Sequence, residues 1–173
     1  MGSTDKKADA PSAVENCACP EPGCLFEGSC SRALVQHLAD AHARPIYAVR
    51  YGQPWNFTMS LSRPWDVAFG VGEDGRSAFF VVLQAAAPGG GAFMSVSLQV
   101  CVRDQAACGV QGSQMLYRSK MTLESLSGDK KKRVATQPAV CDRVHMEVPQ
   151  EMVLSGETIA VSIQIDQVLQ VGW

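Results

Sequence analysis

Cysteine and histidine residues gather in one short stretch near the N-terminus of this chain. Four of the seven cysteines and two of the three histidines fall within residues 17–42: Cys17, Cys19, Cys24, Cys30, His37 and His42. Thiolate sulfur and imidazole nitrogen are the donors that zinc prefers, and cysteines on a Pro/Gly knuckle followed by a histidine pair on a helix are typical of a structural zinc finger. The plain alternative is a set of buried cysteines and helix-surface histidines. The clustering favours one structural Zn²⁺ ion.

The residues themselves leave the first cysteine ligand open. Four residues separate Cys19 from Cys24, which is the spacer that generic zinc fingers use, whereas six residues separate Cys17 from Cys24. Spacing alone therefore favours Cys19 as the first ligand.

The stretch after the cysteines has the spacing of a short amphipathic helix, with one face made of Leu34, His37, Leu38 and Ala41. Ser29 or Ser31 can cap its first turn, and Pro45 ends it. Because His42 lies about 140° around an ideal helix from His37, we expect the last turn to loosen so that both imidazoles reach one ion.

Beyond residue 46 the pattern changes from helical spacing to strict alternation, which predicts half-buried β-strands. The apolar positions of these strands are Phe57, Met59 and Leu61; Met94, Val96, Leu98, Val100 and Val102; Met115, Tyr117, Met121 and Leu123; Val144, Met146 and Val148; and Ile159, Val161, Ile163 and Ile165. The continuous run 79–83 predicts a strand that is covered on both faces. Turn signals at 70–75, 88–91, 109–112 and 128–132 separate the runs. About seven short strands at this spacing predict a mainly β protein, an antiparallel sandwich of two sheets.

Composition limits the function classes. The net charge of −2 and the pI near 5.9 disfavour nucleic acid as the main partner. No apolar stretch reaches the length of a membrane helix, and residues 1–16 lack a signal-peptide pattern. Cysteine used for metal rather than for disulfides indicates the cytoplasm or the nucleus. The basic run 130–133 is read as a solvated hairpin tip.

No catalytic group stands out in the sequence. His145 is the one histidine outside the zinc-finger stretch, and the alternation places it on the polar side of a strand. Pairing with Cys141 as a nucleophile is disfavoured, because four residues along a strand separate the two side chains widely. We therefore predict no catalytic residues, and three regions: a disordered leader at 1–14, the zinc finger at 15–45 and the β-sandwich at 46–170.

The stretch CACPEPGCLFEGSCSRALVQHLADAH, followed by a β region that contains RYGQPWNF and RPWDVAFG, resembles the seven-in-absentia (SINA/SIAH) family of ubiquitin ligases, in particular the SINA-like members of plants. Gly28 and Leu38 also match the SIAH-type finger. One extra residue between Cys24 and His37, around Cys30, departs from it.

The resemblance implies a metal-ligand set of Cys17, Cys24, His37 and His42, with Cys19 a nearby non-ligand. It also implies a TRAF-like β-sandwich that dimerises and captures extended peptides of target proteins, for which Phe57 and Trp65 are candidate peptide-binding residues. The alternative for both aromatic residues is an ordinary place in the core.

The resemblance further implies a role in ubiquitin-dependent degradation, with this chain as the substrate-recognition and dimerisation module. Family members recruit the ubiquitin-conjugating enzyme through a RING domain, which the sixteen residues before Cys17 do not contain, so we do not expect the chain to act alone as a transferase. Homodimers or heterodimers with full-length relatives are expected. The alternative function is a RING-less scaffold or dominant-negative paralogue.

Overall fold

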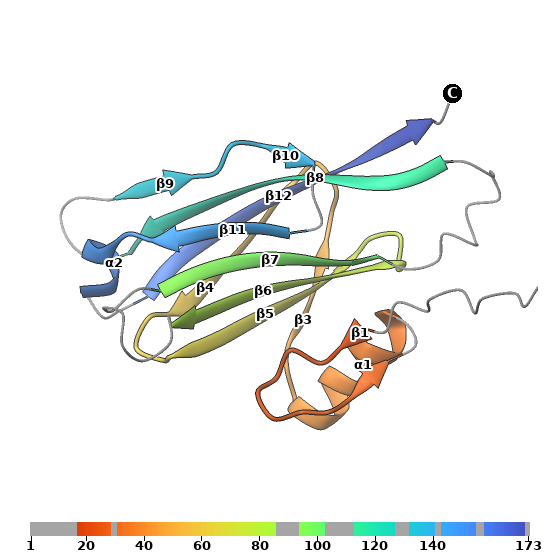
Figure 1. Cartoon of the computed structure of the whole chain (residues 1–173), viewed down its shortest axis with the longest axis horizontal. Coiled ribbons are helices and arrows are strands. Elements are labelled where there is room, and N and C mark those ends of the chain that lie inside the picture. The colour runs from red at the N-terminus through yellow and green to blue at the C-terminus, as the bar shows by residue number, and fades with distance from the viewer. Residues whose placement is uncertain are drawn as a thin grey trace, which may run out of the picture.

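The computed structural model describes residues 17–28, 31–85, 94–102, 113–126, 132–140, 143–154 and 158–171. Two five-stranded sheets and a small N-terminal finger make up this part of the chain (Figure 1). The fold is mainly β, as the alternation predicted. Among the described residues, no helix is both long and apolar enough to span a membrane.

The first sheet has the strand order β11-β7-β6-β5-β3. Its strands are β3 (Ile46–Val49), β5 (Trp65–Gly72), β6 (Ser77–Ala85), β7 (Met94–Val102) and β11 (Arg143–Val148). Four of them pair antiparallel, but β3 pairs parallel with β5, with Ile46 opposite Phe69. The prediction of a wholly antiparallel sandwich is therefore wrong at this edge. The chain enters β3 directly from the finger, so the direction of β3 is set by where the finger sits.

The second sheet has the order β10-β8-β12-β4, with β9 also paired to β8. Its strands are β4 (Pro54–Ser60), β8 (Ser113–Ser125), β9 (Arg133–Ala135), β10 (Ala139–Val140) and β12 (Thr158–Val171). All pairings in this sheet are antiparallel. A short helix that the sequence did not predict, α2 (Gln150–Leu154), joins β11 to β12 and buries Met152.

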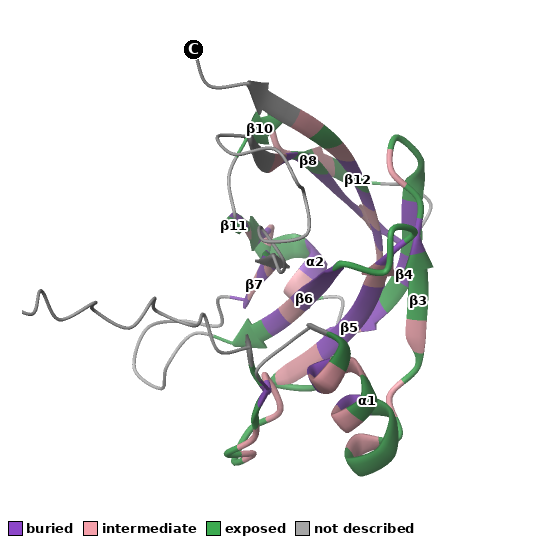
Figure 2. Ribbon diagram, turned by 90° about the vertical axis from the view of Figure 1, so that its right-hand side faces the viewer, coloured by how far each residue is buried: buried purple, intermediate pink, exposed green. Residues whose placement is uncertain are grey.

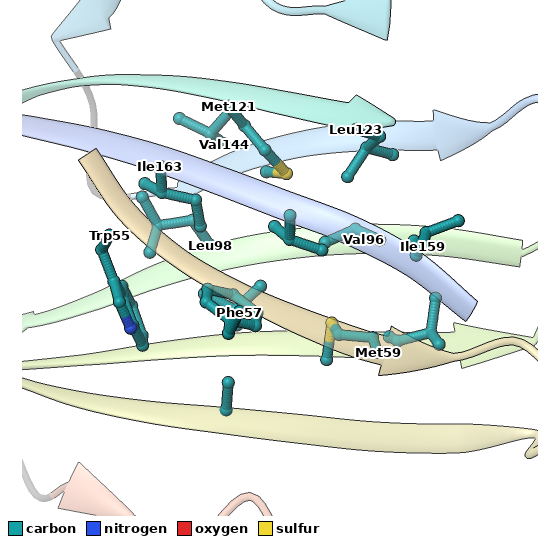
Figure 3. Close-up of a cluster of buried hydrophobic side chains, with 14 of the residues drawn as sticks. Trp55, Phe57, Met59, Val96, Leu98, Met121, Leu123, Val144, Ile159 and Ile163 are labelled. Atoms are coloured by element: carbon teal, nitrogen blue, oxygen red, sulfur yellow. The ribbon is translucent and has the colours of Figure 1, made fainter. Parts of the chain in front are cut away.

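The inward side chains of the two sheets form one apolar core (Figure 3). It combines Trp55, Phe57 and Met59 from β4 with Val96 and Leu98 from β7, Met121 and Leu123 from β8, and Ile159 and Ile163 from β12. The buried positions alternate along β4, β7 and β12 (Figure 2). The described positions of the predicted strands thus confirm their half-buried character; the side chains of Met115 and Val102 lie outside the described residues.

Strand β6 is buried on both faces, as its unbroken apolar run predicted. Phe79, Val81 and Leu83 face the sandwich core, whereas Phe80 and Val82 belong to a second apolar cluster on the outside of the sheet. That second cluster lies under the finger.

The turn predicted to begin at Gly70 begins later. Strand β5 continues to Gly72, and the chain reverses at Gly75, which has φ +65° and donates its N–H to the Gly72 carbonyl at 2.8 Å. A Cβ atom on Gly70 would lie 2.4 Å from Val49 Cγ2 and 3.0 Å from the Trp55 ring. Gly70 is thus required for close packing within a strand rather than for a turn. The other predicted turns fall partly or wholly outside the described residues.

Candidate metal centre

A hairpin presents the two cysteines of the finger. Strands β1 (Cys17–Ala18) and β2 (Glu27–Gly28) pair antiparallel, and the Cys19 N–H donates to the Phe26 carbonyl at 2.9 Å just beyond the paired residues. Between them the chain turns through Gly23, whose φ of +77° suits glycine. The Cys24 N–H then donates to the Glu21 carbonyl at 3.1 Å. This tight turn brings Cys24 back toward Cys19.

Helix α1 (Ser31–His42) presents the two histidines. The helix ends at His42, because Ala43 takes the left-handed conformation at φ +48° and the Arg44 N–H bends back to the Leu38 carbonyl at 3.3 Å. Phe26 stacks on the His37 ring, with centroids 3.9 Å apart and planes 6° from parallel. The rings of His37 and His42 meet edge to face, with their centroids 4.9 Å apart. The hairpin and the helix end therefore direct both imidazoles at the same point.

The four donor atoms of Cys19, Cys24, His37 and His42 all lie within 4.8 Å of one another. Cys24 Sγ lies 3.3 Å from His37 Nε2, and Cys19 Sγ lies 3.5 Å from His42 Nε2. The two Nε2 atoms are 3.2 Å apart. A tetrahedral ion with bonds of about 2.3 Å to sulfur and about 2.05 Å to nitrogen requires donor separations of about 3.6 Å (S to N) and about 3.3 Å (N to N). The group has the right size to hold one metal ion.

Burial affects the ionisation of the first cysteine of the group. Burial raises the pKa of the Cys19 thiol, because a thiolate loses its hydration there. A bound divalent cation reverses this effect by stabilising the thiolate directly.

Among the described side chains, Cys19 is the first cysteine of this group. The set implied by the family resemblance, Cys17 with Cys24, His37 and His42, differs from the described cluster at this first ligand, and Cys17 as first ligand stays a prediction. Cys19 stands at the start of the turn, whereas Cys17 lies two residues earlier, paired with Gly28 in the β1–β2 ladder. Two residues along a strand span about 6.6 Å, so the backbones of Cys17 and Cys19 lie much farther apart than the length of a metal–sulfur bond. The side chain of Cys17, like all of Cys30, lies outside the described residues.

The finger packs its helix on the outer face of β5 and β6. Leu34 and Leu38 are completely buried, and they share the second apolar cluster with four buried sheet residues, Val67, Phe69, Ala78 and Phe80. Their burial confirms the predicted apolar face of the helix, except at Ala41, which is exposed. Leu38 directly follows His37, so packing on the sheet also positions a candidate ligand.

Arg44, which the sequence reading overlooked, joins the finger to the sheet through polar contacts. Its Nε donates to Glu21 Oε1 of the hairpin at 2.5 Å, and its guanidinium lies 3.9 Å from the Asp66 carboxylate on β5. The same guanidinium stands over the Trp65 ring, 5.5 Å from its centroid. One side chain thus bridges the hairpin, the helix end and β5.

The structure does not bring the two candidate peptide-binding residues together. Phe57 lies on β4 in the second sheet, is 9% exposed and belongs to the sandwich core. Phe57 and its neighbours Asn56 and Thr58 also line a cleft of about 510 Å³ on the outer face of that sheet. Trp65 is half-buried on the first sheet, beside the finger, and lines a different cleft. Within the part of the chain that the structure describes, Phe57 and Trp65 thus line two separate clefts.

His145 lies where the alternation placed it, on the outer face of β11. Cys141 lies outside the described residues, so the disfavoured Cys–His pair is not described. Of the basic run 130–133, Lys132 and Arg133 are exposed, and Lys132 contacts the Glu151 carboxylate of α2.

No protein-family model matches this chain, and no curated protein matches it closely enough to indicate its family. The seven-in-absentia resemblance therefore remains a prediction from the residues that carry it.

Proposed function

We propose that this chain is a zinc-stapled protein-recognition module of the SINA-like type, which binds extended peptides of target proteins for ubiquitin-dependent degradation. The observation that carries the proposal is the Cys19–Cys24–His37–His42 group, whose donor atoms lie within 4.8 Å of one another, on a finger whose helix packs against one face of a two-sheet β fold. The metal is zinc, because two thiolates and two imidazoles in tetrahedral array form a closed structural site with no open coordination position.

The role of the ion is structural. The finger is too small to bury a core of its own, and its apolar side chains find partners on the sheet. Zinc holds the hairpin and the helix in the one arrangement that presents Leu34 and Leu38 to β5 and β6. Without it, the outer face of β6, including Phe80, would lose its cover.

The target peptide pairs with β4, the terminal strand of the second sheet. Within the described residues β4 pairs with β12 alone, so its other edge can accept a strand. Asn56 and Thr58 are exposed and alternate with buried side chains along β4. They can therefore contact every second side chain of a peptide that pairs with β4. Tyr47 of β3, 38% exposed, stands at this edge with its ring 6.0 Å from Trp55 and 6.4 Å from Phe57.

Zinc content tests the first half of the proposal. We expect one zinc per chain by elemental analysis of reduced protein, lost in Cys19→Ser and Cys24→Ser and retained in Cys17→Ser. Retention in Cys19→Ser with loss in Cys17→Ser would restore the ligand set implied by the resemblance. Absence of zinc from all samples would refute the finger.

Peptide selection tests the second half. We expect the zinc-loaded protein to enrich an extended motif from a random peptide library, and the bound peptide to slow amide hydrogen exchange in residues 55–60. In cells, depletion of the chain should lengthen the half-life of proteins that carry the motif. Binding without any change of half-life would favour the scaffold alternative, and protection elsewhere than β4 would refute the strand-addition site.

A further inference from the structure

The two cysteines of the candidate metal centre differ in how far solvent reaches them. Cys19 is buried, with 8% of its surface exposed, whereas Cys24 is half-buried on the tight turn of the finger hairpin. Both are free thiols, and their Sγ atoms lie within 4.8 Å of each other. A cysteine that binds a metal is a thiolate, the form that reacts with oxidants, so exposure decides which of the two reacts first. A dissolved oxidant therefore reaches Cys24 before Cys19.

The backbone of the hairpin holds the two sulfur atoms close by bonds that do not involve a metal. The Cys19 N–H donates to the Phe26 carbonyl at 2.9 Å, and the Cys24 N–H donates to the Glu21 carbonyl at 3.1 Å. A disulfide bond of about 2.05 Å requires the two sulfur atoms to approach by less than about 3 Å. Rotation of the side chains about χ1 can supply a movement of this size. The pair is therefore placed to form a disulfide.

A disulfide would remove two of the four candidate ligands. Its sulfur atoms carry no negative charge, and zinc in proteins binds cysteine as the thiolate, so the imidazoles of His37 and His42 would remain as donors. Two ligands do not complete the tetrahedral set of a structural zinc site. Because the finger is too small to have a core of its own, loss of the ion would free the hairpin from helix α1.

We propose that the metal centre is a redox switch, in which a peroxide oxidises Cys24 and Cys19 to a disulfide and the zinc ion is released. The proposal rests on the proposed function in that zinc must first be bound. The Cys24 thiolate attacks one peroxide oxygen, the O–O bond breaks and hydroxide leaves, which gives a sulfenic acid at Cys24. The Cys19 thiolate then attacks that sulfur and displaces a second hydroxide. The two thiolates lose two electrons, the peroxide gains them, and two protons from the solvent convert the hydroxides to water.

Strand β3 connects this switch to the proposed peptide site. It begins at Ile46, four residues after His42, and Ile46 packs against the apolar cluster beneath the finger. The next residue, Tyr47, stands at the β4 edge, with its ring centroid 6.0 Å from that of Trp55. Opening of the finger would remove the packing of Ile46 and loosen β3 beside the β4 edge. Oxidation of the metal centre would in this way regulate peptide binding.

The test uses the Cys17→Ser/Cys30→Ser variant, in which Cys19 and Cys24 are the only cysteines of the tryptic peptide 8–32. The zinc content of the reduced variant is measured first. Hydrogen peroxide is then added, and a chromogenic chelator reports the zinc released. We expect one peptide lighter by two hydrogen atoms for each zinc ion released, and zinc that stays bound over the same time without peroxide. A thiol reductant with fresh zinc should restore the original mass and zinc content.

Amide hydrogen exchange tests the reach of the switch. Oxidation should accelerate exchange in residues 34–49 and leave it unchanged in β12, which belongs to the other sheet. Zinc that stays bound in peroxide, zinc release without loss of the two hydrogen atoms, or unchanged exchange in residues 34–49 would each overturn the proposal.

The order of the measurements separates failure of the switch from failure of the metal centre. A reduced protein without zinc would refute the centre and the switch together, before any peroxide is added. If the variant does not fold, fragmentation of the same peptide from the unchanged, oxidised chain locates the disulfide. A bond between Cys19 and Cys24 supports the proposal, and a bond that includes Cys17 or Cys30 overturns it.

Discussion

Shortening Leu38 to alanine tests whether packing on the sheet holds the metal-binding group together. Leu38 has no exposed surface and lies in the apolar cluster between α1 and the sheet, next in sequence to His37. The change removes three carbon atoms, worth about 2.4 kcal/mol at about 0.8 kcal/mol each. The cavity left behind raises the cost to about 3 kcal/mol. A cost of this size increases the population of the open finger about a hundredfold.

The assay is zinc transfer to a chromogenic chelator in excess, followed by absorbance. We expect Leu38→Ala to release zinc about a hundredfold faster than the unchanged protein, because the finger must open before the chelator reaches the ion. Leu25→Ala is the matched control: it makes the same chemical change in the same finger, at a side chain that is 95% exposed. It should leave the release rate unchanged.

Leu98→Ala separates local opening from general loss of stability. Leu98 is equally buried, but it belongs to the sandwich core rather than to the cluster beneath the finger. Its replacement should lower the free energy of unfolding by about 3 kcal/mol without accelerating zinc release from the folded protein. The reasoning is refuted if Leu38→Ala releases zinc no faster than Leu25→Ala, or if Leu98→Ala releases it as fast as Leu38→Ala.

Three further substitutions test other features of the fold. Ala43→Gly should stabilise the finger by about 0.5–1 kcal/mol, because φ +48° favours glycine; an unchanged or lower melting temperature of the zinc-loaded protein would contradict this. Gly70→Ala should destabilise the protein by about 1–3 kcal/mol in urea unfolding, because its Cβ has no room beside Trp55, and a neutral result would show that the sheet can adjust. Burial raises the pKa of Tyr51 in the folded protein, so above about pH 10 only the unfolded chain ionises this phenol and stability falls as the pH rises. Tyr51→Phe should make the loss of stability between pH 10 and 11 less steep, and an unchanged slope would refute that assignment.

Much of the core could be predicted from the sequence because strand periodicity reports burial directly. The alternating residues of β7 and β12 face the core as their spacing required, and the unbroken run in β6 correctly indicated a strand covered on both faces. Gly70 was misread because glycine marks turns and close packing alike, and sequence spacing does not distinguish them. The close approach of Val49 and Trp55 to Gly70 showed that this glycine serves close packing rather than a turn.

For the candidate metal centre too, the sequence indicated one part and the structure supplied the other. The types and clustering of the cysteines and histidines indicated a metal site, since few other arrangements gather these donors in so short a stretch. The position of Cys19 in the group depends on where the hairpin leaves its paired strands, and it agrees with generic spacing, whereas Cys17 as the ligand stays the prediction of the family resemblance.

The sequence by itself determined most of the long strands, which side chains they bury and which cysteines and histidines gather as candidate metal ligands, because these depend on local periodicity and donor chemistry. Only the tertiary structure decided that β3 runs parallel to β5, that Arg44 joins the finger to the sheet, and that Arg143, His145 and Trp65 line one cleft beside the hairpin. These features depend on pairing between residues far apart in the chain, and side-chain spacing along one strand carries no information about which strand becomes its neighbour.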